Sequence, residues 1–90
     1  MKSTNTPSFD DEVRGVLESD LADIDKLKEL FGRVSATIVA NAGQESELAL
    51  AMQDRETLVK VQIKMETMKS ARKIFATYYT SITGRRAWDE

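Results

Sequence analysis

The feature that most constrains this chain is a row of apolar residues in its C-terminal half, separated alternately by three and four positions. The row consists of Leu58, Val61, Met65, Met68, Phe75, Tyr79 and Ile82, and Arg72 occupies the one place where the spacing leads to a charged residue. This spacing puts the side chains on one face of an α-helix, and that face needs a second helix to cover it. Because neither Gly nor Pro occurs between Gln44 and Thr83, we expect a single helix over residues 46–83, about 55 Å long at 1.5 Å per residue.

The N-terminal half contains a candidate for the covering helix. Ser8 is a suitable N-cap, and Asp10 and Asp11 follow in the first turn, where the helix dipole favours acids. In a heptad register the a and d positions of this half are mostly apolar: Val13, Leu17, Ile24, Leu27, Phe31, Val34 and Ile38, with Asp10, Asp20 and Asn41 as the exceptions. We therefore expect a helix over residues 9–42 that bends, breaks or approaches another element closely at Gly15 and Gly32. A helix that frays at its N-terminal end, or begins only at Ser19, is the alternative.

A helix end and a helix start meet near the middle of the chain. Gly43 can adopt the left-handed conformation of a C-terminal cap, and Ser46 can cap the helix that follows, with Glu47 in its first turn. A loop as short as residues 43–45 makes the two helices antiparallel neighbours. The sequence thus predicts an all-α fold: an antiparallel, coiled-coil-like two-helix hairpin over residues 9–84, between a mobile segment at 1–8 and a polar tail at 85–90. The role of Trp88 in that tail stays open.

Charge is divided between the two halves of the chain. Residues 10–25 hold seven acids (Asp10, Asp11, Glu12, Glu18, Asp20, Asp23 and Asp25), and residues 60–86 hold seven bases (Lys60, Lys64, Lys69, Arg72, Lys73, Arg85 and Arg86). The hairpin would lay these segments side by side, and pairing within one chain is the favoured interpretation. The alternative is that they meet neighbouring subunits, acid to base, in a head-to-tail assembly. Arg72 either pairs with Asp20 across the seam or extends its charged head to water.

The hairpin carries more apolar surface than one partner helix can bury. Val59, Ile63, Ala71, Ile74 and Tyr78 widen the apolar face of the second helix. Ninety residues also bury only a thin core. We therefore expect the chain to associate with itself, and the residues predicted to carry its interactions are those of the first row: Leu58, Val61, Met65, Met68, Arg72, Phe75, Tyr79 and Ile82.

Several functional classes are unexpected. The chain has no Cys and no His, so it offers no disulfide, no zinc site of the usual kind and no His-based catalytic triad. Its acids are spread along a helix face, and no phosphate-binding loop, dinucleotide motif or metal motif is present. We expect no enzymatic activity, no cofactor and no metal. Nucleic-acid binding is also unexpected, because the acidic half would repel phosphates.

The sequence does not indicate a membrane protein. Its longest purely apolar run, Leu48–Met52, is far shorter than the roughly 20 residues that span a bilayer. The first eight residues, MKSTNTPS, lack the apolar centre of a cleaved secretory signal. We expect synthesis in the cytoplasm, no membrane insertion and, if the protein is exported, a route that recognises another signal.

The region from Glu47 to Arg86, ELALAMQDRETLVKVQIKMETMKSARKIFATYYTSITGRR, resembles the C-terminal half of type III secretion inner-rod and needle subunits. The matching features are Leu48, Leu50, Met52, Gln53, Val61, Ile63, Ile74 and Ile82. Two features depart from the needle pattern: an Asn-Pro type loop is replaced by Asn41–Gln44, and the chain continues through Arg85–Glu90.

The resemblance implies a structural subunit that is exported unfolded and polymerises helically around a channel. Its second helix would make most of the subunit contacts, and its partners would be other copies of itself or other proteins of the secretion apparatus. The alternative function is a small helical-hairpin adaptor or secretion chaperone that binds the amphipathic helix of a partner. A third interpretation is a small coiled-coil regulator without an assembly role.

Overall fold

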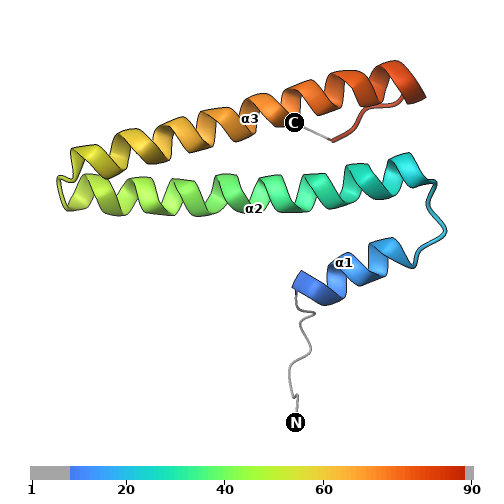
Figure 1. Ribbon diagram of the computed structural model, residues 1–90, viewed down its shortest axis with the longest axis horizontal. Helices are drawn as coiled ribbons and strands as arrows, with labels where there is room; N and C mark the ends of the chain where they lie inside the picture. Colours follow the sequence, from blue (N-terminus) through green and yellow to red (C-terminus); the bar gives the residue numbers. More distant parts are fainter. Residues whose placement is uncertain (1–8, 89–90) are drawn as a thin grey trace, which may run out of the picture.

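Three α-helices form the part of the chain that the structure, a computed structural model, describes, residues 9–88. They are α1 (Phe9–Leu17), α2 (Asp23–Ala51) and α3 (Arg55–Thr83). Figure 1 shows α2 lying between α1 and α3, with α2 and α3 side by side and antiparallel. The shortest extent of the molecule is 16 Å, so the helices form a single layer. The predicted all-α hairpin is confirmed, whereas the predicted mobility of residues 1–8 lies outside the described residues.

The helix expected over residues 9–42 is interrupted close to Ser19, the point up to which the sequence left its start open. The chain leaves the helix after Leu17 and enters the next one at Asp23. In the turn between them, the Ser19 hydroxyl donates to the Val16 carbonyl (2.6 Å) and accepts from the Leu21 N–H (3.4 Å). These local side-chain bonds replace helical backbone bonds. The Lys26 ammonium donates to the Leu17 carbonyl (2.9 Å) and so satisfies an acceptor at the end of α1.

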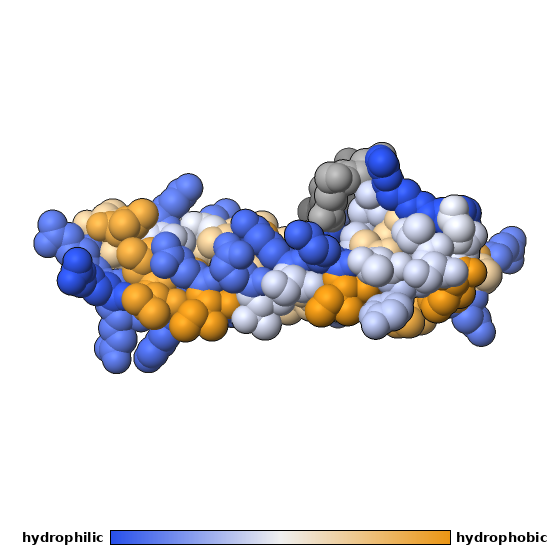
Figure 2. Space-filling model, turned by 90° about the horizontal axis from the view of Figure 1, so that it is seen from above, coloured by the Kyte–Doolittle hydropathy of each residue, from blue (hydrophilic) through white to orange (hydrophobic). Residues whose placement is uncertain are grey.

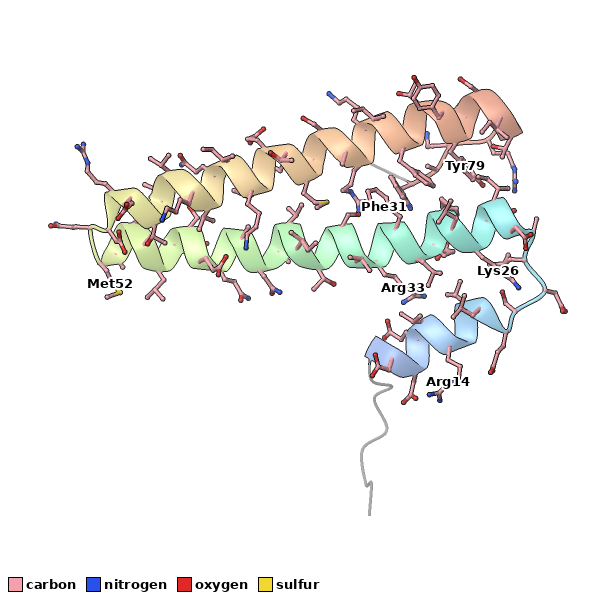
Figure 3. All side chains as sticks on the ribbon, in the orientation of Figure 1. Arg14, Lys26, Phe31, Arg33, Met52 and Tyr79 are labelled. Atoms are coloured by element: carbon pink, nitrogen blue, oxygen red, sulfur yellow. The ribbon has the colours of Figure 1, made fainter. Side chains whose placement is uncertain are left out.

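The break lets α1 fold back onto α2. Val16 is buried, and the Arg33 guanidinium of α2 contacts the Glu12 carboxylate of α1 at 2.6 Å. Figure 3 shows Arg33 on the side of α2 that faces α1. Gly15 and Gly32 both lie within helices, so neither is the site of the break.

The predicted loop at residues 43–45 is wrong, because α2 continues through Gly43 and Ser46 to Ala51. The connection is Met52–Asp54 instead. Gln53 has a left-handed backbone (φ 57°), and the Asp54 N–H donates to the Ala49 carbonyl (2.9 Å). The Asp54 carboxylate then caps α3 by accepting from the Thr57 N–H (3.1 Å). This turn gives two helices of 29 residues each, which pair along their whole length.

The later turn changes which face of α2 meets α3. The buried residues of α2 are small: Gly32, Ser35, Ala42 and Ala49. Two of the expected a/d residues point elsewhere, since Leu27 is 54% exposed and Val34 is 42% exposed. Small residues spaced by seven allow the larger side chains of α3 to approach the α2 backbone closely. The seam therefore packs a face of α2 that is mostly small residues, with Phe31 as a large exception, against the apolar row of α3.

The expected polar tail does not extend away from the hairpin. Gly84 has a left-handed backbone (φ 73°), and its N–H donates to the Thr80 carbonyl (2.7 Å), which ends α3. The chain then turns back so that Ala87 is buried and Trp88 is half-buried. The described part of the tail is thus a packed element of the fold.

Candidate functional site

The predicted row on α3 forms the seam of the hairpin. Val61 and Tyr79 are buried, and five further members are half-buried along the same face: Leu58, Met65, Met68, Arg72 and Phe75. Ile82 departs from the prediction, since it is exposed. These residues are covered by α2 of the same chain, so the row itself is not the surface that this structure presents to another molecule.

Arg72 makes contacts that neither sequence interpretation included. Its Nη1 donates to the Gly32 carbonyl (2.9 Å) and to the Ser35 hydroxyl (2.5 Å), both on α2. Its guanidinium carbon lies 4.4 Å from the centre of a Trp88 ring. The predicted partner Asp20 lies in the turn after α1. The hairpin turn lies nine residues later than expected, and this shift of register brings Gly32 and Ser35 opposite Arg72 instead. Arg72 therefore ties α3 to α2 and to the C-terminal tail.

An aromatic cluster holds the tail against the hairpin. The ring centres of Phe31 and Phe75 are 5.2 Å apart, and those of Phe75 and Trp88 are 5.6 Å apart. Trp88 lies directly over Gly32: a Cβ atom at Gly32 would be 2.6 Å from the Trp88 Nε1 atom. Of the three outcomes predicted for Gly32, close approach is the one observed. A glycine within a helix, together with a tryptophan beyond the end of the last helix, was the available signal for this contact.

Asp25 links α2 to the end of α3 through two polar partners. The Tyr79 hydroxyl donates to Asp25, and the Arg85 guanidinium contacts both carboxylate oxygens at 3.1 and 3.2 Å. The hydrogen bond from Tyr79 lowers the pKa of Asp25, partial burial opposes this, and Arg85 lowers it further. The same hydrogen bond raises the pKa of Tyr79.

Asp25 and Arg85 form an ion pair between the acidic and the basic segment, as expected for pairing within one chain. The prediction that the two charged segments lie side by side is otherwise wrong for α1. Figure 1 shows α1 on the opposite side of α2 from α3, because the chain reverses between Leu17 and Asp23. The acids of α1 are thereby separated from the bases of α3 by the width of α2.

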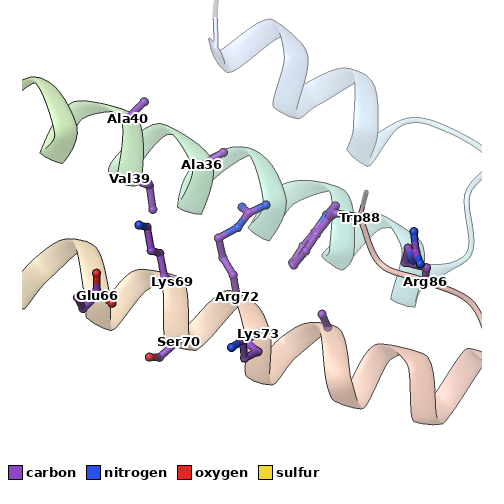
Figure 4. Close-up of a pocket in the computed structure, with 11 residues that line it drawn as sticks. Ala36, Val39, Ala40, Glu66, Lys69, Ser70, Arg72, Lys73, Arg86 and Trp88 are labelled. Atoms are coloured by element: carbon purple, nitrogen blue, oxygen red, sulfur yellow. The ribbon is translucent and has the colours of Figure 1, made fainter. Parts of the chain in front are cut away.

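A basic groove runs between α2 and α3 beside Trp88 (Figure 4), with a volume of about 880 Å³. Small apolar residues line it: Ala36, Val39, Ala40 and Ala76. Four cations and one acid also line it: Lys69, Arg72, Lys73, Arg86 and Glu66. Figure 4 shows Trp88 between Arg72 and Arg86. The groove combines an apolar lining with an excess of positive charge, a combination that sequence reasoning did not identify.

A second apolar row lies on the outer face of α3. Its members, Val59, Ile63, Ile74, Tyr78 and Ile82, are 54–69% exposed. At 100° per residue Val59, Ile63 and Ile74 lie on the side of α3 opposite the seam, whereas Tyr78 and Ile82 lie progressively nearer to the seam. Figure 2 looks onto this side of the molecule and shows apolar side chains gathered in separate groups along it. We call these five residues the outer row; four of them were predicted as surplus apolar surface, whereas Ala71 is half-buried.

Other kinds of site are not evident in the described residues. Among residues 9–88, no group of three or more His, Cys, Asp or Glu side chains is placed to hold a metal ion. None of the three helices is long and apolar enough to cross a membrane. A scan against models of known protein families found no match, and searches of curated proteins and of solved structures found none.

Proposed function

We propose that this chain is a structural subunit of a bacterial protein-secretion apparatus, of the inner-rod or needle type, which assembles with further copies through the outer row of α3. The observation that carries the proposal is the exposure of five large apolar side chains on the face of α3 that α2 leaves uncovered. Within residues 9–88, which form a single layer of helices, no other element covers that face.

The apolar surface of the outer row is only marginally large enough to hold two subunits together. Burying the exposed part of a large apolar side chain contributes about 1–2 kcal/mol, so five such residues contribute about 5–10 kcal/mol. Association costs about 4–15 kcal/mol in lost translational and rotational freedom. Contacts through the outer row alone would therefore be marginal, and a stable polymer requires additional contacts between subunits.

The assignment to a secretion apparatus rests on the resemblance of residues 47–86 to inner-rod and needle subunits. The helical hairpin supports it, because helix-loop-helix is the plan that the resemblance implies. One detail differs from the expected pattern: Leu48 and Leu50 end α2 instead of opening the second helix. The turn at Met52–Asp54 consequently falls within the region of resemblance.

Sedimentation velocity of the purified chain tests the assembly step. We expect wild-type protein to form larger species as its concentration rises, and Ile63→Asp to shift these species to monomer. Gln62→Asp is the matched control, because Gln62 is an exposed neighbour outside the outer row. Circular dichroism of each variant checks that the helices are intact.

The result separates the proposal from its alternatives. A monomer at every concentration, or equal behaviour of Ile63→Asp and Gln62→Asp, would contradict assembly through the outer row. A discrete dimer that does not grow with concentration, or a complex formed only with a partner protein, would favour the adaptor or chaperone function instead.

A further inference from the structure

The edge of the molecule formed by α1 and the turn after it is strongly acidic. Its exposed acids are Asp10, Asp11, Glu18, Asp20 and, at the start of α2, Asp23. Two bases lie beside them: Arg14, 3.5 Å from Asp11, and Lys26, whose ammonium donates to the Leu17 carbonyl. Two leucines stand among these acids, Leu17 at 53% and Leu21 at 43% exposure. We call this surface the acidic edge. It presents two apolar side chains surrounded by negative charge.

The basic groove has the complementary character. Its lining from Ala36, Val39 and Ala76 is apolar, and Lys69, Lys73 and Arg86 are exposed around it. Arg72 is held in place by Gly32 and Ser35, so at least one cation of the groove is fixed before any partner arrives. A ligand that suits this groove has an apolar centre and an acidic surround.

The two surfaces do not meet within one chain. Burial of Val16 and the contact between Arg33 and Glu12 hold α1 against α2, on the side away from α3. The complementary surfaces therefore belong to different parts of one subunit. A contact between different surfaces of two copies leaves a free acidic edge on one copy and a free groove on the other, so it can be repeated indefinitely.

We propose that the basic groove binds the acidic edge of a second copy of this chain, so that subunits join head to tail. Leu17 and Leu21 of one copy pack against the apolar lining of the groove in the next. The acids around the two leucines face Lys69, Lys73 and Arg86. This inference rests on the proposed function, since it supplies the additional contact that the outer row needs for a stable polymer.

Charge reversal tests this arrangement directly. The groove variant carries Lys69→Glu and Lys73→Glu, and the edge variant carries Glu18→Lys and Asp20→Lys; all four residues are exposed, and Glu18 and Asp20 lie between helices. We expect each variant alone to need about a tenfold higher concentration to assemble at low salt. Mixed together, the two variants should assemble again, because each reversed surface then finds its complement. A single chain that carries all four substitutions should also assemble.

The control variant carries Arg55→Glu and Lys60→Glu. It changes the net charge by the same amount on exposed residues of α3 outside the groove, and it should assemble as wild type does. Circular dichroism confirms that each variant is folded before its assembly is compared by sedimentation velocity.

Three results would overturn the head-to-tail contact. The first is normal assembly of the folded groove variant or the folded edge variant. The second is failure of the mixture to recover. The third is recovery of the groove variant by Asp89→Lys and Glu90→Lys in the same chain, which would identify the chain's own C-terminal acids as the occupant. If Ile63→Asp abolishes assembly while charge reversal has no effect, the proposed function stands without this contact; a monomeric wild type contradicts both.

Discussion

Adding one methyl group at Gly32 should displace the tail from the hairpin. The Cβ atom of Gly32→Ala would lie 2.6 Å from Nε1, 3.1 Å from Cε2 and 3.3 Å from Cζ2 of Trp88, and these are the three nearest atoms. Non-bonded atoms in a folded protein do not approach a Cβ atom as closely as 2.6 Å. Gly32 belongs to the long helix α2, whose backbone is fixed by its pairing with α3. The side chain that moves is therefore Trp88, which lies beyond the end of the last helix.

Two opposing effects decide whether this substitution raises or lowers the free energy of unfolding. Replacing Gly by Ala within a helix stabilises it by about 1 kcal/mol. A half-buried tryptophan removes about 100 Å² of apolar surface from water, so its displacement costs about 2.5 kcal/mol at about 25 cal/mol per Å². We expect Gly32→Ala to lower the free energy of unfolding by about 1.5 kcal/mol. In a Trp88→Ala background the clash is absent, and the same substitution should raise the free energy of unfolding by about 1 kcal/mol.

A double-mutant cycle measures how far the effect of Gly32→Ala on the free energy of unfolding depends on Trp88. Urea denaturation followed by circular dichroism is performed on wild type, Gly32→Ala, Trp88→Ala and the double variant, all with Ile63→Asp to limit association. We expect a coupling energy of about 2.5 kcal/mol between the two sites. Trp88 is the only tryptophan of the chain, so the shift of its fluorescence to longer wavelength in Gly32→Ala reports its transfer to water.

Gly43→Ala is the matched control. Gly43 also lies within α2, and a Cβ atom there would meet nothing within 4 Å. This substitution should stabilise the protein by about 1 kcal/mol with or without Trp88. Equal stabilisation by Gly32→Ala and Gly43→Ala, with unchanged fluorescence, would contradict the packing of Trp88 on Gly32.

The remaining predictions concern the seam. The lowered pKa of Asp25 means that its contribution to stability is present above its ordinary pKa of 3.8 and is lost as the pH falls through the lower folded-state value. The urea midpoint of wild type should therefore exceed that of Asp25→Asn near neutral pH, and the difference should shrink in acid; a constant difference would contradict the contact with Tyr79 and Arg85. Ala42→Leu should lower the free energy of unfolding by about 1–3 kcal/mol, because Ala42 is fully buried against α3. Urea denaturation checks this against Ala40→Leu, an exposed site that should change it little.

The seam of α3 was predictable because its signal is strong and local. Large apolar residues at regular helical spacing define a face whatever the partner is. The corresponding face of α2 was not predictable in the same way. Heptad assignment identified Phe31, which stacks on Phe75 of α3, but it favours large apolar residues. It missed Ser35, Ala42 and Ala49, which are buried on the same face and whose small side chains give no hydrophobic pattern.

The position of the turn depended on two competing local signals. Gly43 offers a helix end, but a glycine within a helix costs only about 1 kcal/mol relative to alanine. Pairing of α2 with α3 along 29 residues outweighs that cost. The competing signal is Asp54, whose carboxylate caps α3 by accepting from the N–H and the hydroxyl of Thr57, three residues later. The nine-residue error in the turn also accounts for the wrong partner of Arg72.

The candidate surfaces depended on tertiary structure in different degrees. The outer row was evident in part, because apolar residues such as Ile63 and Ile74 exceed what one partner helix covers. The basic groove was not, since it requires the tail to fold back and add Arg86 and Trp88 to the lining that α2 and α3 supply. The separation of the acidic edge from the bases of α3 likewise follows from the reversal of the chain at residues 18–22.

The central claim is that α3 presents a second apolar face through which copies of this one-layer hairpin assemble. Sedimentation velocity of wild type and Ile63→Asp across a wide range of concentration tests it most directly. The account predicts species that grow with concentration for wild type and a folded monomer for Ile63→Asp. A wild-type protein that remains monomeric throughout, or an Ile63→Asp variant that assembles as wild type does, would contradict it.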